Sequence, residues 1–431
     1  MTWIIVCIIA LVVLAIHLRS AECSLGLPFA YLALLEFNHV PGAFVHEEFL
    51  FRSRYVEIGI YYTAIGAVAF VAGTWIASIG QIEFSREDRY NRSFLNFCLT
   101  GGWSIIVLIS VLPVVPSLNA TLDKSAAIWL IAVALGLRSS VFRSHAPQML
   151  GWTCALFAYP IWSLLVGGFL SYGSTAIFIA LSSLVVSVRR GVAVIATCCL
   201  LTFLGLTVFV NWFAGREMIR EQVWGGAPIA DRIETVVTVF SNFSWFSPSN
   251  EMHLYALDAR LNQNYFVGLA ADRLETGQVD YLYGSSLWEA FIAVIPRAIW
   301  PDKPVYGGSP ELVARMTGLW LDPNTSFGVG NVMEFYINFG IAGVIAGFLI
   351  LGWALGKLDR KAAQAAAQEN PGRIFLYFLP AAALIQPLGS LVELCGGAAA
   401  AFVAAQFWKW LWERRLRAAH TNSKELIVAE N

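Results

Sequence analysis

Charged residues are scarce in this sequence. Asp, Glu, Lys and Arg make up 13% of its 431 residues, and the formal net charge is −1. A chain with so little charge and no basic excess is not expected to bind nucleic acid. Hydrophobic residues make up 58% of it, and the mean hydropathy is +0.64. This profile is typical of a membrane protein with several spans, because helices that face hydrocarbon need long apolar runs.

The seven cysteines lack the spacing of a metal site. Most of them lie inside apolar runs, where Cys usually packs as a small hydrophobic residue. We therefore expect no disulfide framework, no zinc site and no cofactor. The cysteines in apolar runs are Cys7, Cys98, Cys154, Cys198 and Cys199.

The N-terminal segment has neither the basic start nor the small-residue cleavage site of a secretory signal peptide. Its sequence, MTWIIVCIIALVVLAIHLRS, predicts instead a first membrane-spanning helix.

Long apolar runs predict an all-α, polytopic integral membrane protein with about eleven transmembrane helices. Basic residues gather in the loops on the side of the C-terminal tail, whereas the short loops on the other side keep only Arg52, Arg54 and Lys124. Because cytoplasmic loops carry the excess of Lys and Arg, we predict a periplasmic N-terminus and a cytoplasmic C-terminus. The runs cover residues 2–18, 24–38, 58–79, 94–115, 125–137, 148–169, 171–188, 191–213, 331–356, 374–391 and 395–412.

One connection is far longer than the others. Residues 214–330 lie on the predicted outer face and are rich in aromatic residues, so we expect a large, ordered periplasmic loop that contains short helices. This loop separates an N-terminal membrane bundle, residues 1–213, from C-terminal membrane helices, residues 331–412, and a cytoplasmic tail, residues 413–431. No internal repeat is visible, which argues against a transporter built from inverted repeats.

The stretch IPRAIWPDKP holds cations on a stiff backbone within the long loop. Its prolines restrict the backbone at their own positions and just before them. Arg297 and Lys303 are therefore candidates for binding a diphosphate, and Trp300 is a candidate interfacial anchor. Arg52 and Arg54 supply two more cations on this side, with the bidentate geometry that phosphate favours. Each of these cations could instead pair with a nearby carboxylate or a lipid headgroup.

Two short helices are predicted around this stretch. SSLWEAFIAVIP places Leu287, Phe291 and Ile295 at helical spacing and predicts an amphipathic helix in the outer interface. After the stretch, Ser309 is a suitable N-cap and Gly318 a suitable stop. A helix start behind two glycines is an anion site in principle, so Ser309 is a candidate for substrate binding. A well-capped surface helix is the simpler interpretation.

The next apolar run opens with a polar stripe. Asn331, Glu334 and Asn338 recur at i, i+3 and i+7 at the outer end of a predicted membrane helix, where polar groups usually face a cavity or a partner. A carboxyl group in a partly dry site is suited to be a general base, so Glu334 is a candidate catalytic residue and Asn338 a candidate for substrate binding. Pairing of Glu334 with a basic residue is the alternative. Glu393, near the turn between the last two spans, is a second carboxylate on this face or a cap of the hairpin.

The segments FIAVIPRAIWPDKP and GVGNVMEFYINFGIAGVIAGFLILG together resemble the signature of Wzy-type O-antigen and oligosaccharide repeat-unit polymerases. The resemblance covers residues 288–352, and the rest of the chain agrees in architecture. Arg297, Lys303 and Glu334 occupy matching motif positions, whereas Arg52 and Arg54 are inferred from sidedness alone.

The resemblance implies a metal-independent glycosyltransferase of the bacterial inner membrane whose site faces the periplasm. It would transfer a growing glycan from undecaprenyl diphosphate to a new lipid-linked repeat unit, in the biosynthesis of O-antigen lipopolysaccharide or a related polysaccharide. Arg297 would stabilise the leaving diphosphate, and Glu334 would deprotonate the acceptor hydroxyl. The expected partners are undecaprenyl-diphosphate-linked oligosaccharide, the lipid bilayer and a chain-length regulator protein.

Two other functions fit the same sequence features. An O-antigen ligase uses the same donor chemistry with another acceptor. A polysaccharide transporter or flippase belongs to a different class, and it should gather its polar groups at mid-membrane rather than near the outer face.

Overall fold

The computed structural model describes residues 1–20, 24–49, 53–79, 90–111, 116–187, 191–295, 299–300, 302–304, 308–321 and 328–429. Helices follow one another along this part of the chain and it contains no strand, so the predicted all-α class is confirmed. The helices are α1 (Thr2–Ser20), α2 (Leu27–Phe37), α3 (Val40–Glu48), α4 (Arg54–Ser78), α5 (Arg92–Val111), α6 (Pro116–Ala126), α7 (Ile128–Phe142), α8 (Ala146–Gly167), α9 (Ser171–Val185), α10 (Gly191–Trp224), α11 (Ile229–Ser241), α12 (Glu251–Arg260), α13 (Asn264–Glu275), α14 (Ser285–Ala293), α15 (Ser309–Thr317), α16 (Asn331–Ala367), α17 (Pro371–Ala383) and α18 (Leu391–Ala429).

Within the described residues, eight helical segments are long and apolar enough to cross a membrane. Each of them overlaps one of the predicted runs, so a membrane protein is the class that this architecture supports. The eight segments are Thr2–Ser20, Arg54–Ser78, Arg92–Val111, Asn119–Phe142, Ala146–Gly167, Cys199–Trp224, Asn331–Ala367 and Leu391–Ala418.

The other three predicted spans contain shorter helices. The run 24–38 contains α2, of 11 residues, and α3 begins only after Asn38 and His39. The runs 171–188 and 374–391 contain α9 and α17, of 15 and 13 residues. At 1.5 Å per residue these helices are only about 20 Å long, less than the hydrocarbon thickness of a bilayer. The total of eleven spans therefore stays a prediction.

The helices α4 and α16 form the most extensive contact in the molecule. They approach closely through glycines: a Cβ atom on Gly352 would collide with the backbone of Phe70, and one on Gly356 would meet Ala77 at 2.9 Å. A Cβ atom on Gly66 would likewise lie 2.7 Å from the ring of Phe348. Glycine contacts of this kind are usual between membrane helices.

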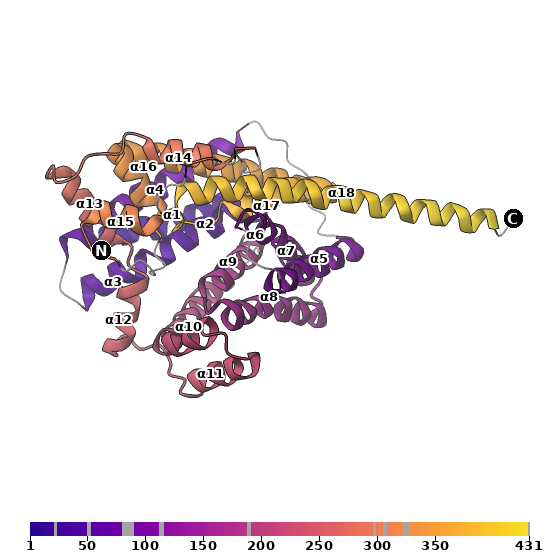
Figure 1. Cartoon of the computed structure of the whole chain (residues 1–431), viewed down its shortest axis with the longest axis horizontal. Coiled ribbons are helices and arrows are strands. Elements are labelled where there is room, and N and C mark those ends of the chain that lie inside the picture. Colours follow the sequence, from indigo (N-terminus) through magenta and orange to yellow (C-terminus); the bar gives the residue numbers. More distant parts are fainter. Residues whose placement is uncertain are drawn as a thin grey trace.

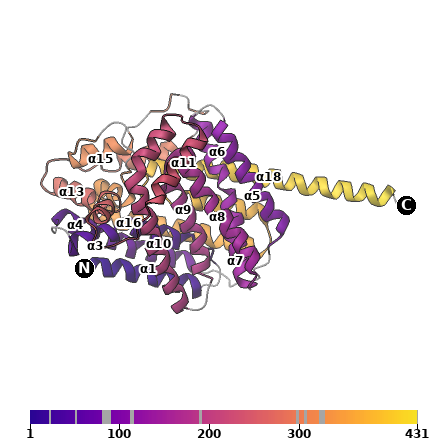
Figure 2. The ribbon, with the colours of Figure 1, turned by 90° about the horizontal axis from the view of Figure 1, so that it is seen from below.

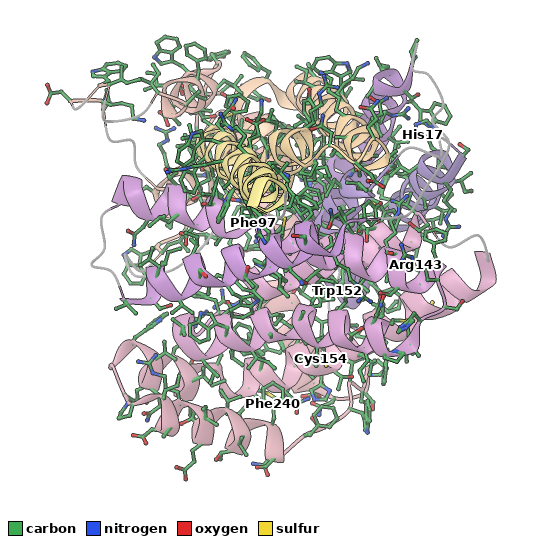
Figure 3. All side chains as sticks on the ribbon, turned by 90° about the vertical axis from the view of Figure 1, so that its right-hand side faces the viewer. His17, Phe97, Arg143, Trp152, Cys154 and Phe240 are labelled. Carbon is green, nitrogen blue, oxygen red and sulfur yellow. The ribbon has the colours of Figure 1, made fainter. Side chains whose placement is uncertain are left out.

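A second layer of helices lies beside this pair, as Figures 1 and 2 show. The helices α5 to α9 pack on one another there, and α10 and α11 lie at its margin. The long helix α18 connects the layers, and Figure 3, seen from the side of the C-terminus, shows Phe97 of α5 beside it. The ring of Phe97 lies 5.6 Å from that of Trp408 and 5.1 Å from that of Trp412.

Two helices continue past predicted domain boundaries, at residues 213 and 412. Helix α10 continues to Trp224, so the long connection starts later than residue 214. Helix α18 continues to Ala429, so the tail from residue 413 extends the last membrane helix, as Figure 1 shows. Between α10 and α16 the described residues form the five short helices α11 to α15.

Candidate active site

The polar stripe lies on a helix that folds back on the rest of α16. Helical geometry is interrupted at Phe339 and Gly340, and Gly340 has φ +61° and ψ −145°, a conformation that only glycine adopts readily. Beyond this break the chain returns alongside residues 331–338. A Cβ atom on Gly343 would collide with the carbonyl oxygen of Phe335, and the rings of Phe335 and Phe348 lie 5.3 Å apart. We call residues 331–338 the re-entrant helix.

This arrangement differs from the continuous helix predicted over residues 331–356. The re-entrant helix starts at Asn331, nine residues before Gly340, so its start is roughly 13 Å below the turn. Tyr31 of α2 also lies at this depth, where it stacks on Phe70 at 4.8 Å. The polar stripe therefore lies inside the helix bundle, not at the outer end of a straight helix.

All three polar residues of the stripe are buried, with exposed fractions of 0% for Asn331 and 1% for Glu334 and Asn338. Asn331 accepts a hydrogen bond from the Tyr31 hydroxyl at 2.6 Å and donates to the Gly389 carbonyl at 2.9 Å. This end of the stripe is therefore bonded to other segments of the protein and does not face lipid.

Asn338 joins the re-entrant helix to α14. Its amide group donates to the Ser286 hydroxyl at 2.8 Å and accepts from the Gly284 backbone at 3.0 Å. The carbonyl of Ile337, just before the helix break, accepts a hydrogen bond from the Leu282 backbone at 2.9 Å. Residues 282–286 therefore replace the helical bonds that are lost at the turn.

The side chain of Glu334 lies at the N-terminal end of α18. Its Oε2 atom accepts a hydrogen bond from the Leu391 amide at 2.7 Å, and its carboxyl group also interacts with the Ser286 hydroxyl. A carboxylate at a helix N-terminus is stabilised by the unpaired amides and the helix dipole. This bond gives Glu334 a structural role in addition to any catalytic role.

Glu393 caps α18, which is the second of its two predicted roles. The Ser390 amide donates to Glu393 Oε2 at 3.1 Å, and the Glu393 amide donates to Ser390 Oγ at 3.2 Å. This reciprocal pair is a capping box.

Three acidic residues and one lysine interact with one another and are here called the polar cluster: Glu334, Glu289, Glu393 and Lys124. The charges of Glu289 and Glu393 act on the carboxyl group of Glu334, and Lys124 interacts with Glu393. Burial raises the pKa of Glu289, an effect that Arg315 partly offsets. Grouped carboxylates with unequal surroundings are typical of acid–base sites, although structural clusters have the same property.

The two described cations that were predicted to bind diphosphate have other partners. Lys303 Nζ donates to the Ile295 carbonyl at 2.9 Å and lies 3.4 Å from that of Ala293, at the C-terminal end of α14. Arg54 is exposed, and its Nη2 atom lies 3.8 Å from Asp272 Oδ1. Arg52 and Arg297 lie outside the described residues, so their roles stay predictions.

The remaining predicted site residues lie around α14 and α15. Helix α15 starts at Ser309 with Gly308 as its N-cap, one residue earlier than predicted, and ends before Gly318 at φ +72°. The Ser309 hydroxyl is buried and has no hydrogen-bond partner among the described residues. Trp300 is 39% exposed.

The residues that sequence reasoning missed come from segments far apart in the chain. Ser286 and the Leu391 amide contact the polar stripe directly. Nearby, the Tyr62 hydroxyl lies 3.2 Å from that of Tyr336, and both bond to Glu275. The tyrosines give no local signal, because single tyrosines are common in membrane helices.

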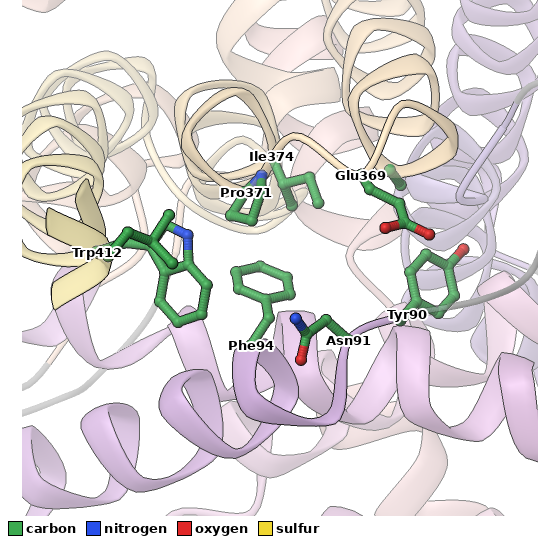
Figure 4. A pocket seen from close by; sticks show the side chains of 9 residues that line it. Tyr90, Asn91, Phe94, Glu369, Pro371, Ile374 and Trp412 are labelled. Carbon is green, nitrogen blue, oxygen red and sulfur yellow. The ribbon is translucent and has the colours of Figure 1, made fainter. Parts of the chain in front are cut away.

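The described residues include a cavity of about 160 Å³ at another place. It lies between the start of α5, the connection from α16 to α17, and the middle of α18, and Figure 4 shows Phe94, Glu369 and Trp412 around it. None of the predicted site residues lines it. The described part of the chain also contains no group of three or more His, Cys, Asp or Glu that could hold a metal ion.

The fold and the polar cluster define an α-helical membrane protein with a re-entrant helix that carries a buried carboxyl group. The chain belongs to the family of a domain of unknown function, DUF8712, which matches residues 29–368. Comparison with curated proteins found no match, and neither did comparison with solved structures.

Proposed function

We propose that the protein is a membrane glycosyltransferase that polymerises undecaprenyl-diphosphate-linked repeat units on the periplasmic face of the bacterial inner membrane. The observation that carries the proposal is the buried Glu334 carboxyl group, which lies beside Ser286 and Asn338 on the re-entrant helix. The order of the cationic stretch and Glu334 along the chain, which resembles that of the polymerases, supports the proposal.

In the proposed reaction a hydroxyl group of the acceptor sugar attacks the anomeric carbon of the donor glycan. The bond between that carbon and the diphosphate oxygen breaks, and the electron pair leaves with the lipid diphosphate. Glu334 takes the proton of the hydroxyl group. Arg297, with Arg52 and Arg54, would stabilise the charge on the diphosphate.

The contacts of Lys303 suggest a supporting role for this residue. By binding the carbonyl groups at the end of α14, it holds the helix that carries Ser286. Cations near a helix C-terminus stabilise it. Trp300, Ser309 and Asn338 are proposed to contact the sugars or the lipid.

The substitution Glu334→Gln tests the catalytic role. A Gln side chain can still accept the Leu391 hydrogen bond, so the variant should fold and insert, yet polymer formation should fall roughly 100-fold or more because the base is lost. Polymer length and membrane abundance should be measured together. The matched control is Glu393→Gln, which removes the same charge from the capping box and should keep polymerisation. Normal polymer in the Glu334→Gln strain at normal abundance would refute the role.

A transporter or flippase is the second candidate function, and the interrupted helices favour it. The path of α2 and α3 breaks at Asn38 and His39, and α16 breaks at Phe339 and Gly340. Interrupted helices form the substrate sites of many transporters.

A deletion strain separates these functions. Loss of the long glycan ladder with single-repeat caps retained would indicate a polymerase, whereas loss of all capping would indicate a ligase or a flippase.

A further inference from the structure

Three arginines lie together where α10 and α12 meet. Arg216 and Arg220 are one turn apart near the end of α10, and Arg260 is the last residue of α12, which packs on α10. Burial lowers the pKa of the Arg260 guanidinium, and the positive charges of Arg216 and Arg220 lower it further. The three side chains therefore form one cationic group, here called the arginine cluster.

The arginine cluster has too few negative partners. Arg216 Nη2 lies 3.7 Å from Glu217 Oε1, but the Glu217 side chain is 89% exposed and such pairs are weak. Within the described part of the chain, Arg220 and Arg260 have no carboxylate within 4.0 Å.

Two donors of the cluster also lack acceptors. Arg216 Nη1 and Arg220 Nε are buried and have no hydrogen-bond partner among the described residues. Leaving buried donors of charged groups unpaired is costly, so an acceptor of opposite charge would stabilise the cluster.

Aromatic rings hold the guanidinium groups in place. The Arg216 guanidinium carbon lies 3.8 Å from the centre of the Phe213 ring. That of Arg220 lies 5.2 Å from Phe169 and 5.3 Å from Trp224. Cation–π contacts of this kind orient a guanidinium group without occupying its N–H donors, so the cluster is preorganised for a further ligand.

We propose that the arginine cluster binds the phosphate group of a membrane lipid. Two or more arginines offer the planar, multiple donors that match phosphate oxygens. Trp224, at the end of the apolar segment Cys199–Trp224, is 59% exposed, as expected for a ring at headgroup level. The neighbouring α11 exposes Ile229, Ile233 and Val237 along one face, which suits contact with acyl chains.

This site is separate from the polar cluster around Glu334, so the inference does not depend on the proposed function. The helices α10 and α12 have their main contacts with α8, α11 and α3, whereas Glu334 lies among α14, α16 and α18. Figure 1 shows the two groups of helices on opposite sides of the molecule. The phosphate could belong to a phospholipid or to a polyprenyl diphosphate, which share this chemistry.

The test uses the purified full-length protein and native mass spectrometry of retained lipids. The probes are phosphatidylglycerol, undecaprenyl diphosphate and a glycolipid without phosphate, each with and without inorganic pyrophosphate as a competitor. We expect both phosphate lipids to bind more tightly than the glycolipid, and pyrophosphate to displace them. Arg220→Gln should weaken this binding about 10-fold, and Arg216→Gln with Arg220→Gln more strongly. The matched control is Arg414→Gln, which removes one exposed charge beside Trp410 and should bind as the unmodified protein does.

The outcomes separate the sources of phosphate. Preference for undecaprenyl diphosphate would identify a carrier-lipid site, preference for phosphatidylglycerol a phospholipid site, and binding of pyrophosphate alone would overturn the lipid part of the proposal. Equal binding by the double variant and the Arg414→Gln control would overturn it entirely. If the Gln variants do not fold, Arg220→Lys keeps the charge without the planar donors and should still weaken binding severalfold. Binding unchanged in Arg220→Lys would also count against the proposal.

Discussion

The fold-back of α16 makes Gly343 intolerant of any side chain, and Gly343→Ala measures how firmly the re-entrant helix is held. The new Cβ atom would lie 3.2 Å from the Phe335 carbonyl carbon and from Phe339 Cβ, and closer still to the Phe335 carbonyl oxygen. Both carbonyl atoms belong to the backbone, so a side-chain rotation cannot relieve the collision. The re-entrant helix must shift, and overpacking of this kind typically costs about 1–3 kcal/mol.

Gly151→Ala is the matched control for this substitution. Gly151 also lies inside a helix, α8, but a Cβ atom there would meet no atom within 4 Å. Replacing an unhindered helical Gly by Ala gains about 0.5–1 kcal/mol. The two variants therefore have opposite expected signs in unfolding experiments on the detergent-solubilised protein. If Gly343→Ala stabilises the protein as Gly151→Ala does, residues 331–338 do not fold back on α16.

Three further predictions concern the neighbouring segments. Lys303→Met should lower the free energy of unfolding by about 1–2 kcal/mol, because it removes charged hydrogen bonds to the end of α14. An unchanged free energy of unfolding would mean that Lys303 serves ligand binding alone. Burial raises the pKa of Glu289, so the stability that its protonated form contributes is complete below the unfolded pKa of about 4.3 and is lost as the pH rises through the folded pKa. Glu289→Gln should therefore be more stable than the unmodified protein at pH 7, with the difference shrinking towards pH 4, and parallel melting curves at all pH values would contradict this. A reporter fused near Gln278 should be active as alkaline phosphatase; activity only as a cytoplasmic reporter would reverse the proposed topology.

The long membrane helices could be predicted from the sequence, because the length of an apolar run is a local property. The run 331–356 shows the limit of this reasoning. The spacing of Gly343 and Gly347 is typical of sites where neighbouring helices approach, but in the structure both face Phe335 of their own helix. A small residue indicates that another segment approaches closely, but it does not indicate which segment. The fold-back at Gly340 could therefore not be predicted from the spacing.

The arginine cluster shows the same limit in a functional site. The spacing of Arg216 and Arg220 indicates two cations on one helix face, but the pair lies beyond the end of the apolar run at Phe213 and has no conspicuous sequence context. Arg260 comes from another helix, and only the packing of α12 on α10 brings it to the cluster. The cationic stretch around Arg297, by contrast, is marked in the sequence by its prolines.

The fold-back changes what the polar stripe requires. At the outer end of a straight helix, Asn331 and Glu334 could have been satisfied by water. Roughly 9–13 Å below the turn, they need partners from the protein, and the Tyr31 hydroxyl, the Gly389 carbonyl and the Leu391 amide supply them. Glu334 is only 1% exposed, so a substrate can reach it only if a covering element moves.

Helix α14 is the covering element that the contacts single out. It is held to the re-entrant helix by the Asn338–Ser286 hydrogen bond and at its far end by Lys303. Its outer face exposes Trp288 and Phe291, whose rings stack at 5.6 Å, as expected for a helix in the membrane interface. A lipid-linked sugar that approaches through the interface would therefore meet α14 first, and displacing this helix would release the Ser286 hydroxyl from Asn338 and uncover the Glu334 carboxyl group in the same movement.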